Sequence, residues 1–250
     1  MNDELLAERQ GPVAVLTIRR SHRRNALGDA LVAHLREVLN DNDANPAIAA
    51  TVLTGSAPGF CAGSDLKELG TMSLDEMCAH EARTAAFCRG IAQLNKPVIA
   101  AVEGFALGGG FVLAASCDVV VSSRSARWSL PEVEIGWIPP WGLETLVNRV
   151  GVSRARQLTW GGQVLLGEQA VRLGLADHLA EDGEALSGAI AQAQILAGLP
   201  QEAVSATKLY YAAHGARNGE SGDALASRMF KDNCRGATAQ ATLKRFGVKV

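Results

Sequence analysis

The stretch Pro97–Gly110 decides the fold, and it reads Pro-Val-Ile-Ala-Ala-Val-Glu-Gly-Phe-Ala-Leu-Gly-Gly-Gly. Its first six residues are apolar and rich in valine and isoleucine, which is typical of a buried strand. The glycines that follow allow positive φ and the close approach of another segment or a ligand. An apolar helical pattern then continues to about Ala115. We therefore expect a strand, a tight turn and the start of a helix.

An earlier stretch repeats this arrangement. The apolar run Ala50–Thr54 leads into Phe60–Leu66, which reads Phe-Cys-Ala-Gly-Ser-Asp-Leu. The start of a helix leaves backbone N–H groups without intrahelical partners, and these groups favour negative charge. Two such donors that converge on one oxygen would form an oxyanion hole. The alternative is a pair of ordinary strand-to-helix turns.

Length and composition indicate a soluble globular protein. The chain has 250 residues, of which 48% are hydrophobic and 20% are charged, and its formal net charge is −2. The near-neutral charge gives no support for nucleic acid as a partner. The five cysteines show no CxxC spacing, which argues against a disulfide framework and a zinc site and favours buried thiols in a reducing compartment. Because the N-terminus is acidic and no long apolar run follows, we expect a cytoplasmic protein without a membrane span.

Strand and helix patterns alternate over the first part of the chain, which predicts an α/β fold with parallel strand pairing. The expected strands are 13–18, 47–54, 97–102 and 119–121, and the expected helices are 26–40 and 73–95. After Gly198 the character changes, and Pro200 marks a break. We expect a core over residues 1–198 and a helical region over 199–250, with helices at 202–214 and 225–246.

The glycine-rich turn does not match the known phosphate-binding loops. A dinucleotide fingerprint would need glycine at position 106 or 113, where Ala106 and Leu113 stand. No Lys-Ser or Lys-Thr follows the last glycine, and no G-x-S-x-G elbow of a serine hydrolase is present. The five histidines form no pair with metal-ligand spacing, so we predict no metal site.

Four ordered motifs closely resemble the crotonase (enoyl-CoA hydratase/isomerase) superfamily, from about residue 10 to the C-terminus. They are Asn25-Ala26-Leu27, the turns within 60–66 and 104–110, and Leu130-Pro131-Glu132. The resemblance implies a spiral of repeated β-β-α units, followed by helices that cover the site or reach a neighbouring subunit. It also implies a homotrimer or hexamer that acts on an acyl-CoA thioester. Coenzyme A is then part of the substrate, and no separate cofactor is expected.

The resemblance assigns roles to particular residues. The backbone N–H groups of Ser64 and Gly109 would hold the thioester carbonyl oxygen. The adenine would be received largely by the backbone of Ala62, Gly63, Asp65 and Leu66. Basic contacts to coenzyme A would come from Lys67, Arg24 and Lys244, with Arg245 beside the last. The alternative for each basic residue is a solvated surface cation.

The acid and base residues depart from the hydratase pattern. Hydratases of this family carry one glutamate two residues after the last glycine of the triple, where Val112 stands, and a second in the position of Glu132. A single buried carboxylate with a raised pKa can remove a proton from one carbon and return it to another. We therefore expect Glu132 to shift a double bond in an enoyl-CoA. A hydratase with a non-standard second acid or base and a non-catalytic acyl-CoA-binding relative stay open as alternatives.

Other residues near these motifs leave alternatives open. Four further glutamates could replace the missing carboxylate, but surface or ion-pairing roles are the expectation for Glu81, Glu103, Glu134 and Glu144. Family members that use an aspartate near Pro139-Pro140 are not matched, because this chain has none there. Trp137 and Trp141 would either pack in the core or a subunit interface, or form flat apolar walls for a particular acyl group.

Overall fold

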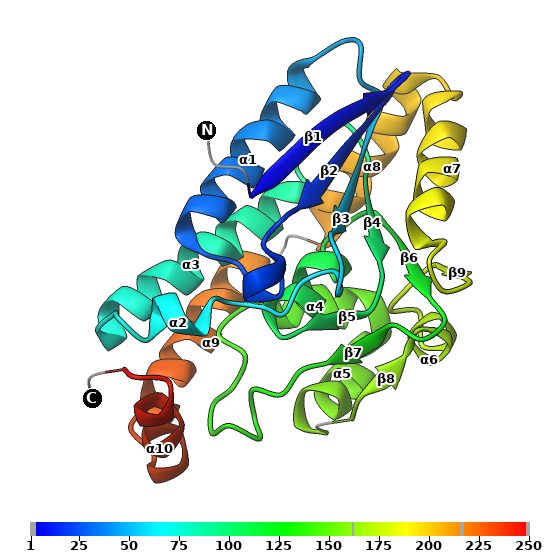
Figure 1. Ribbon diagram of the computed structural model, residues 1–250. Coiled ribbons are helices and arrows are strands. Elements are labelled where there is room, and N and C mark those ends of the chain that lie inside the picture. The colour runs from blue at the N-terminus through cyan, green and yellow to red at the C-terminus, as the bar shows by residue number, and fades with distance from the viewer. Residues whose placement is uncertain (1–3, 162, 216–217, 249–250) are drawn as a thin grey trace.

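The computed structural model describes residues 4–161, 163–215 and 218–248 (Figure 1). Strands and helices alternate through the first 180 residues, and helices follow. In chain order the elements are β1 (Leu5–Gln10), β2 (Val13–Ile18), the 3-10 turn η1 (Ser21–Arg23), α1 (Asp29–Ala44), β3 (Ala50–Gly55), α2 (Leu66–Leu69), α3 (Leu74–Ile91), β4 (Val98–Val102), β5 (Phe105–Leu107), α4 (Gly109–Ala115), β6 (Val119–Ser123), β7 (Arg127–Ser129), α5 (Leu143–Trp160), β8 (Leu165–Leu166), α6 (Gly167–Arg172), β9 (His178–Ala180), α7 (Ala185–Ala197), α8 (Gln201–Gly215), α9 (Gly219–Asn233) and α10 (Ala237–Arg245).

The main sheet has the strand order β1-β2-β3-β4-β6-β9, and a small second sheet has the order β5-β7-β8. From β2 to β9 the neighbours in the main sheet run parallel, as the alternating pattern predicts. Strand β1 adds an antiparallel edge, with Leu5 opposite Ile18. Strand β1 was not predicted, because its outer residues are polar and exposed, as is usual for an edge strand.

Helices cover both faces of the main sheet, with α1 and α3 on one side and α7 on the other (Figure 1). Side chains alternate between the two faces along each strand. In β3, Val52 packs with the alanines of α7, whereas Leu53 belongs to the larger core beneath α1 and α3. Because both faces are buried, the strands are apolar almost throughout, as the sequence of β4 illustrates.

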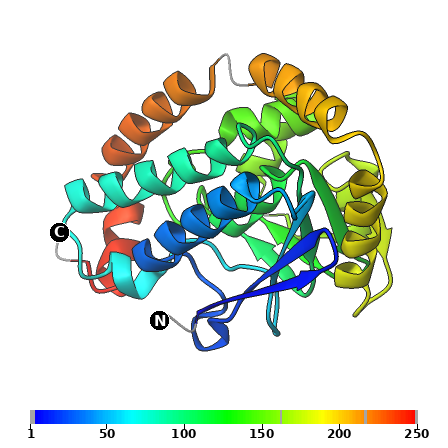
Figure 2. The same cartoon turned by 90° about the horizontal axis from the view of Figure 1, so that it is seen from above.

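The helical region after residue 198 is present, but one predicted helix is wrong. The structure divides the expected helix 225–246 into α9 and α10, which turn at Cys234–Gly236, with Gly236 as the N-terminal cap of α10. Helix α9 runs alongside α3 (Figure 2). The end of α10 meets α2, where a side chain on Gly70 would collide with the carbonyl oxygen of Phe246. The C-terminal helices therefore pack on the same core that precedes them.

The start of α1 also differs from the prediction. The helix begins at Asp29 rather than at Ala26, because Leu27 forms a β-bridge with Ser64 and Gly28 is extended as the N-terminal cap. Just before this segment, Arg24 and Asn25 both have positive φ, at 55° and 57°. The Asn25 side chain is buried and donates to the carbonyl oxygens of Ser56 and Gly59, at 2.6 and 2.7 Å. This asparagine thus fixes the loop that leads to the first glycine turn.

The state of the cysteines and the character of the helices can be stated directly. All five cysteines are unpaired, and all but Cys78 are buried. In the part of the chain that the structure describes, no helix has both the length and the apolar character that crossing a bilayer requires.

Candidate active site

The two glycine turns meet because short β contacts join the segments that carry them. The backbone of Cys61 bridges to Ala106 in β5, and the N–H of Leu107 donates to the Cys61 carbonyl at 3.0 Å. A methyl group built on Gly63 would lie 3.0 Å from the backbone nitrogen of Gly109. With φ of 91° at Gly63, glycine satisfies both the turn and this close approach.

Two backbone N–H groups beside the same pocket have no partner among the described residues. Ser64 follows Gly63 in the first turn, and Gly109 is the first residue of α4. Within the described residues, neither backbone N–H has a hydrogen-bond partner. The structure thus brings together the two N–H groups that the sequence motifs single out, beside a pocket that Ser64 and Gly109 both line.

Glu132 lies next to the second turn because β5 and β7 run parallel. Leu107 pairs with Ser129, the last residue of β7, and Leu130-Pro131-Glu132 follows. A methyl group on Gly108 would lie 2.9 Å from Oε1 of Glu132. Its Oε2 is fully buried and has no hydrogen-bond partner among the described residues. Burial, helped by the charge of Glu81, raises the pKa of Glu132 to about 7.

Glu81 is the site residue whose position the sequence analysis misjudged. It is buried in α3, with 5% of its surface exposed, and lines the same pocket as Glu132. Its Oε1 accepts a hydrogen bond from Ser64 Oγ at 2.7 Å, and its Oε2 accepts one from Trp141 Nε1 at 2.6 Å. A surface or ion-pairing role is therefore wrong for Glu81.

A signal for Glu81 was present in the helix pattern. The buried face of α3 carries Met77, Thr84, Ala85 and Cys88, and Glu81 falls on the same face at a spacing of three or four residues. A carboxylate on the apolar face of a helix is seldom buried without a partner. The other candidate glutamates do not line this pocket, namely Glu103, Glu134 and Glu144.

Trp137 and Trp141 both line the pocket and are buried, with 7% and 3% of their surfaces exposed. Trp137 packs edge-to-face on Phe230 of α9, with ring centroids 5.7 Å apart. The cavity measures about 120 Å³. Its walls are mainly apolar and include residues of α10 and the chain beyond it, namely Leu243, Phe246 and Val248. These walls favour a small apolar group next to Glu132.

The position that holds a glutamate in hydratases is filled by Val112, which is buried and also lines the pocket. A methyl group on Gly142 would collide with the Val112 side chain, so the loop after Pro140 packs directly on it. Apart from Glu132, the pocket holds one carboxylate among the described residues, and that is Glu81 on α3.

The residues expected to contact coenzyme A lie at the edge of this region. Ala62, Gly63 and Leu66 line the pocket. The Asp65 side chain instead caps α2 and pairs with Arg20 at 3.1 Å. The three expected cations are exposed, with Arg24 over the ring of Phe105 at 4.6 Å, Lys67 on α2 and Lys244 on the neighbouring α10.

One group of side chains has the composition of a metal site. Asp29, Glu68 and His80 bring ligand-type atoms within 4.8 Å of one another. The Asp29 carboxylate already accepts two hydrogen bonds from Arg83, at 3.0 and 2.7 Å. A cation at this point would have to displace the guanidinium group.

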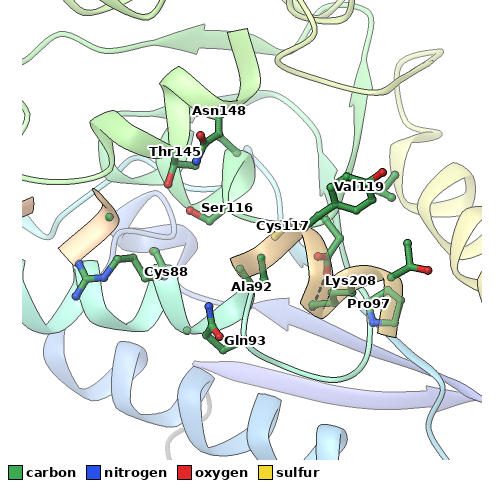
Figure 3. Close-up of a pocket in the computed structure, with 18 of the residues that line it drawn as sticks. Cys88, Ala92, Gln93, Pro97, Ser116, Cys117, Val119, Thr145, Asn148 and Lys208 are labelled. Atoms are coloured by element: carbon green, nitrogen blue, oxygen red, sulfur yellow. Dashed lines mark hydrogen bonds and ion pairs between the residues drawn. The ribbon is translucent and has the colours of Figure 1, made fainter. Parts of the chain in front are cut away.

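A larger cavity of about 1030 Å³ lies elsewhere, between α3, α5, α8 and α9 (Figure 3). Its wall includes Cys117, Thr145 and Lys208. Lys208 pairs with Asp118 at 2.6 Å, which ties α8 to the start of β6. None of the residues that carry the four sequence motifs lines this cavity.

Comparisons with known proteins show the family to which the chain belongs. The family described as enoyl-CoA hydratase/isomerase matches residues 8–249. A probable enoyl-CoA hydratase of Rhizobium meliloti is 35% identical over 207 residues, which cover 82% of this chain and 80% of that protein. The 2,3-dehydroadipyl-CoA hydratase of Escherichia coli is 38% identical over 177 residues, which cover 70% and 69%.

A solved structure shares the fold over nearly the whole chain. The crystal structure of an enoyl-CoA hydratase/isomerase from Mycobacterium paratuberculosis superposes with a TM-score of 0.87 at 27% identity, covering 98% of this chain and 99% of that one. The spiral α/β architecture expected from the motifs is therefore confirmed. The chain belongs to the enoyl-CoA hydratase/isomerase family, the crotonase superfamily, and is an acyl-CoA enzyme.

Proposed function

We propose that the protein moves a double bond within an enoyl-CoA thioester, with Glu132 as the acid and base. The N–H groups of Ser64 and Gly109 hold the thioester oxygen while an enolate forms. Glu132 removes a proton from one carbon of the acyl chain and returns it to another. Coenzyme A belongs to the substrate, and the reaction uses no separate cofactor.

The observation that carries this proposal is the Glu132 carboxyl beside the second glycine turn, whose Oε2 is buried and has no hydrogen-bond partner among the described residues. A carboxyl with a pKa near 7 exchanges protons readily at neutral pH, because neither of its forms is strongly favoured. Val112 leaves no second carboxylate where hydratases of the family have one. A single proton shuttle fits this set of residues better than activation of a water molecule does.

Hydration is the second candidate, and two observations favour it. Glu81 lies in the same pocket, and the relatives named above include hydratases. In this reaction Glu81 would hold the attacking water while Glu132 supplies the proton. Because both Glu81 oxygens already accept hydrogen bonds from side chains, we rank hydration below isomerisation.

The test compares 3-enoyl-CoA and crotonyl-CoA as substrates, with products separated by mass spectrometry and chromatography. We expect the double bond of 3-enoyl-CoA to move to the conjugated position, with slower or no addition of water to crotonyl-CoA. Faster hydration than isomerisation would favour the second candidate. Binding of thioesters without turnover across a panel of acyl chains would indicate a non-catalytic relative instead.

We also propose that the chain assembles as a trimer or a dimer of trimers. Support comes from large apolar side chains exposed on α8 and α9, including Tyr211 at 67% and Leu225 at 49% exposure. Tyr211 also lines the larger cavity. Sedimentation equilibrium should give the mass of three or six chains, and a monomer at micromolar concentration would contradict this. A cytoplasmic location stays a prediction from the sequence.

A further inference from the structure

One carboxylate, Glu81, joins the two segments that flank the oxyanion hole. It accepts from Ser64 Oγ in the first turn, at 2.7 Å, and from Trp141 Nε1 in the loop before α5, at 2.6 Å. Both oxygens of the Glu81 carboxylate are therefore used as acceptors. Glu81 itself comes from α3, so three separate parts of the chain meet at this carboxylate.

Each partner of Glu81 is next to, or part of, a residue that carries one of the two backbone donors. Ser64 carries the first donor on its own backbone, so a bond to its Oγ limits how that peptide can rotate. Trp141 lies against the second donor, because a methyl group on Gly109 would be 3.1 Å from Cζ2 of the indole. The tryptophan ring thus packs against Gly109, the first residue of α4.

The loop that carries Trp141 is itself held firmly. The next residue, Gly142, donates its N–H to Asp223 of α9 at 2.8 Å, and Asp223 also pairs with Arg89 of α3. Two prolines precede the tryptophan, which limits the conformations of the loop. Because the loop is held in this way, the hydrogen bond from Glu81 fixes the position of the indole ring against Gly109.

We propose that Glu81 is a positioning residue, which sets the two donors of the oxyanion hole by bonding Ser64 Oγ and Trp141 Nε1 at the same time. The inference rests on the proposed function in that it takes the N–H groups of Ser64 and Gly109 as the groups that hold the thioester oxygen. The inference adds a side chain that holds the oxyanion hole in place, whereas the hole itself consists of backbone N–H groups. Donors must lie within a few tenths of an ångström of the developing oxyanion to be fully effective.

Two substitutions separate the hydrogen bonds of Glu81 from its charge. In Glu81→Gln, the amide oxygen can accept from Trp141 and the amide nitrogen can donate to the Ser64 hydroxyl, so both contacts persist without charge. In Glu81→Leu, both contacts are lost at similar volume. Trp141→Phe removes one contact while keeping a ring against Gly109.

The measurement is the ¹³C chemical shift of butyryl-CoA labelled at its carbonyl carbon, free and bound to the full-length protein. A saturated thioester does not react, so the shift reports polarisation of the carbonyl by the two donors. We expect a clear downfield shift with the wild type and with Glu81→Gln. With Glu81→Leu we expect the shift to fall by more than half, and kcat to fall at least tenfold. Trp141→Phe should lie between these results.

Trp137→Phe is the matched control, because Trp137 lines the same pocket but makes no bond to Glu81. It should alter the affinity for the thioester and leave the carbonyl shift at the wild-type value. An equal carbonyl shift in the wild type, Glu81→Leu and Trp141→Phe would overturn the positioning role. If Glu81→Leu does not fold, the carbonyl shift with Trp141→Phe is the test, and a shift equal to that of the wild type overturns the positioning role.

The same data distinguish this inference from the proposed function. If bound butyryl-CoA shows no downfield shift even with the wild type, the assignment of the oxyanion hole itself fails. If the wild type polarises the carbonyl but Glu81→Gln behaves like Glu81→Leu, the charge of Glu81 matters and not its two bonds, which also contradicts the positioning role.

Discussion

The pocket has two walls that differ in the groups they offer. The wall made by the glycine turns presents backbone N–H groups, at Ser64 and Gly109, and almost no functional side chain. The wall made by α3 and the loop 131–142 presents Glu81, Glu132 and Trp141. The first wall depends on the conformation of the main chain, whereas the second depends on which side chains are present and on how they are paired.

This difference predicts two kinds of sensitivity. On the backbone wall, changes that keep φ and the spacing of the turns should be tolerated, even where they alter a side chain. On the side-chain wall, a change of one atom in a carboxylate should alter the chemistry. The substitutions below test each wall in turn.

The largest effect is expected on the side-chain wall, from Glu132→Gln. The amide cannot accept and return a proton, and loss of a general acid or base costs roughly 10²–10⁴-fold in rate. We expect kcat to fall by this amount while KM changes little. Glu134→Gln is the matched control, because Glu134 is exposed and does not line the pocket. Full activity of Glu132→Gln in both the isomerase and hydratase assays would rule out the role given to this residue.

On the backbone wall, activity should be lost when the conformation of the main chain is disturbed, as in Gly108→Ala. Gly108 has φ of 53°, and an added methyl group would lie 2.9 Å from Glu132 Oε1. The strain and the contact together should lower kcat by about 10²-fold, since a displacement of about 1 Å at a reacting group has effects of this size.

Gly11→Ala provides the control for strain alone. Gly11 has a similar φ of 60°, but a methyl group there meets nothing within 4 Å. Gly11→Ala should lose about 1–2 kcal/mol in the free energy of unfolding, measured with urea, from positive φ at a non-glycine residue. Gly108→Ala should lose at least as much, because its φ of 53° is combined with a ψ of −126°. Only Gly108→Ala should lose activity. Equal kcat values for the two variants would show that the second turn does not need its glycine for catalysis.

The pH dependence of the rate tests how the two carboxylates of the side-chain wall interact. The pKa of Glu132 is raised to about 7, mainly by burial, and Glu81 on α3 is the one charged group among the described residues that contributes. A general base must be ionised, so kcat/KM should rise with pH, with a midpoint near 7, and then level off. Glu81→Gln removes a negative charge near Glu132, so the pKa and the midpoint should move to lower pH. A midpoint that stays fixed would indicate that Glu81 does not act on Glu132 electrostatically.

The two walls also differ in how well the sequence predicts them. Glycine at 63 and at 108–110 leaves few alternatives to a tight turn, and parallel strands bring turns at their carboxyl ends to one edge. The backbone wall could therefore be located from local patterns and the family motifs. Glu132 could be located only from the family motif Leu130-Pro131-Glu132, because no strand was predicted before it.

Glu81 could not be assigned in this way. It lies 51 residues before Glu132 in the chain, and its partners Ser64 and Trp141 come from different segments. The spacing along α3 places it on the buried face of that helix, but its partners depend on how α3 packs against the first glycine turn and the loop before α5, which a local pattern does not encode. The division of the expected helix 225–246 has a similar cause. Cys234–Gly236 carries only one strong helix breaker, and the turn there follows from the packing of α9 and α10 in one apolar cluster.

The smallest effect is expected where the two walls meet, from Ser64→Ala. This variant keeps the backbone N–H that serves as a donor and loses only the hydroxyl that bonds Glu81 at 2.7 Å. We expect kcat to fall a few-fold, because one of the two contacts that position the donors is lost and the donors themselves remain. Ser187→Ala, at an exposed hydroxyl on α7, is the control and should match the wild type. A loss as large as that of Glu132→Gln would mean that the Ser64 side chain takes part in the chemistry, and the first wall would then no longer be one of backbone groups alone.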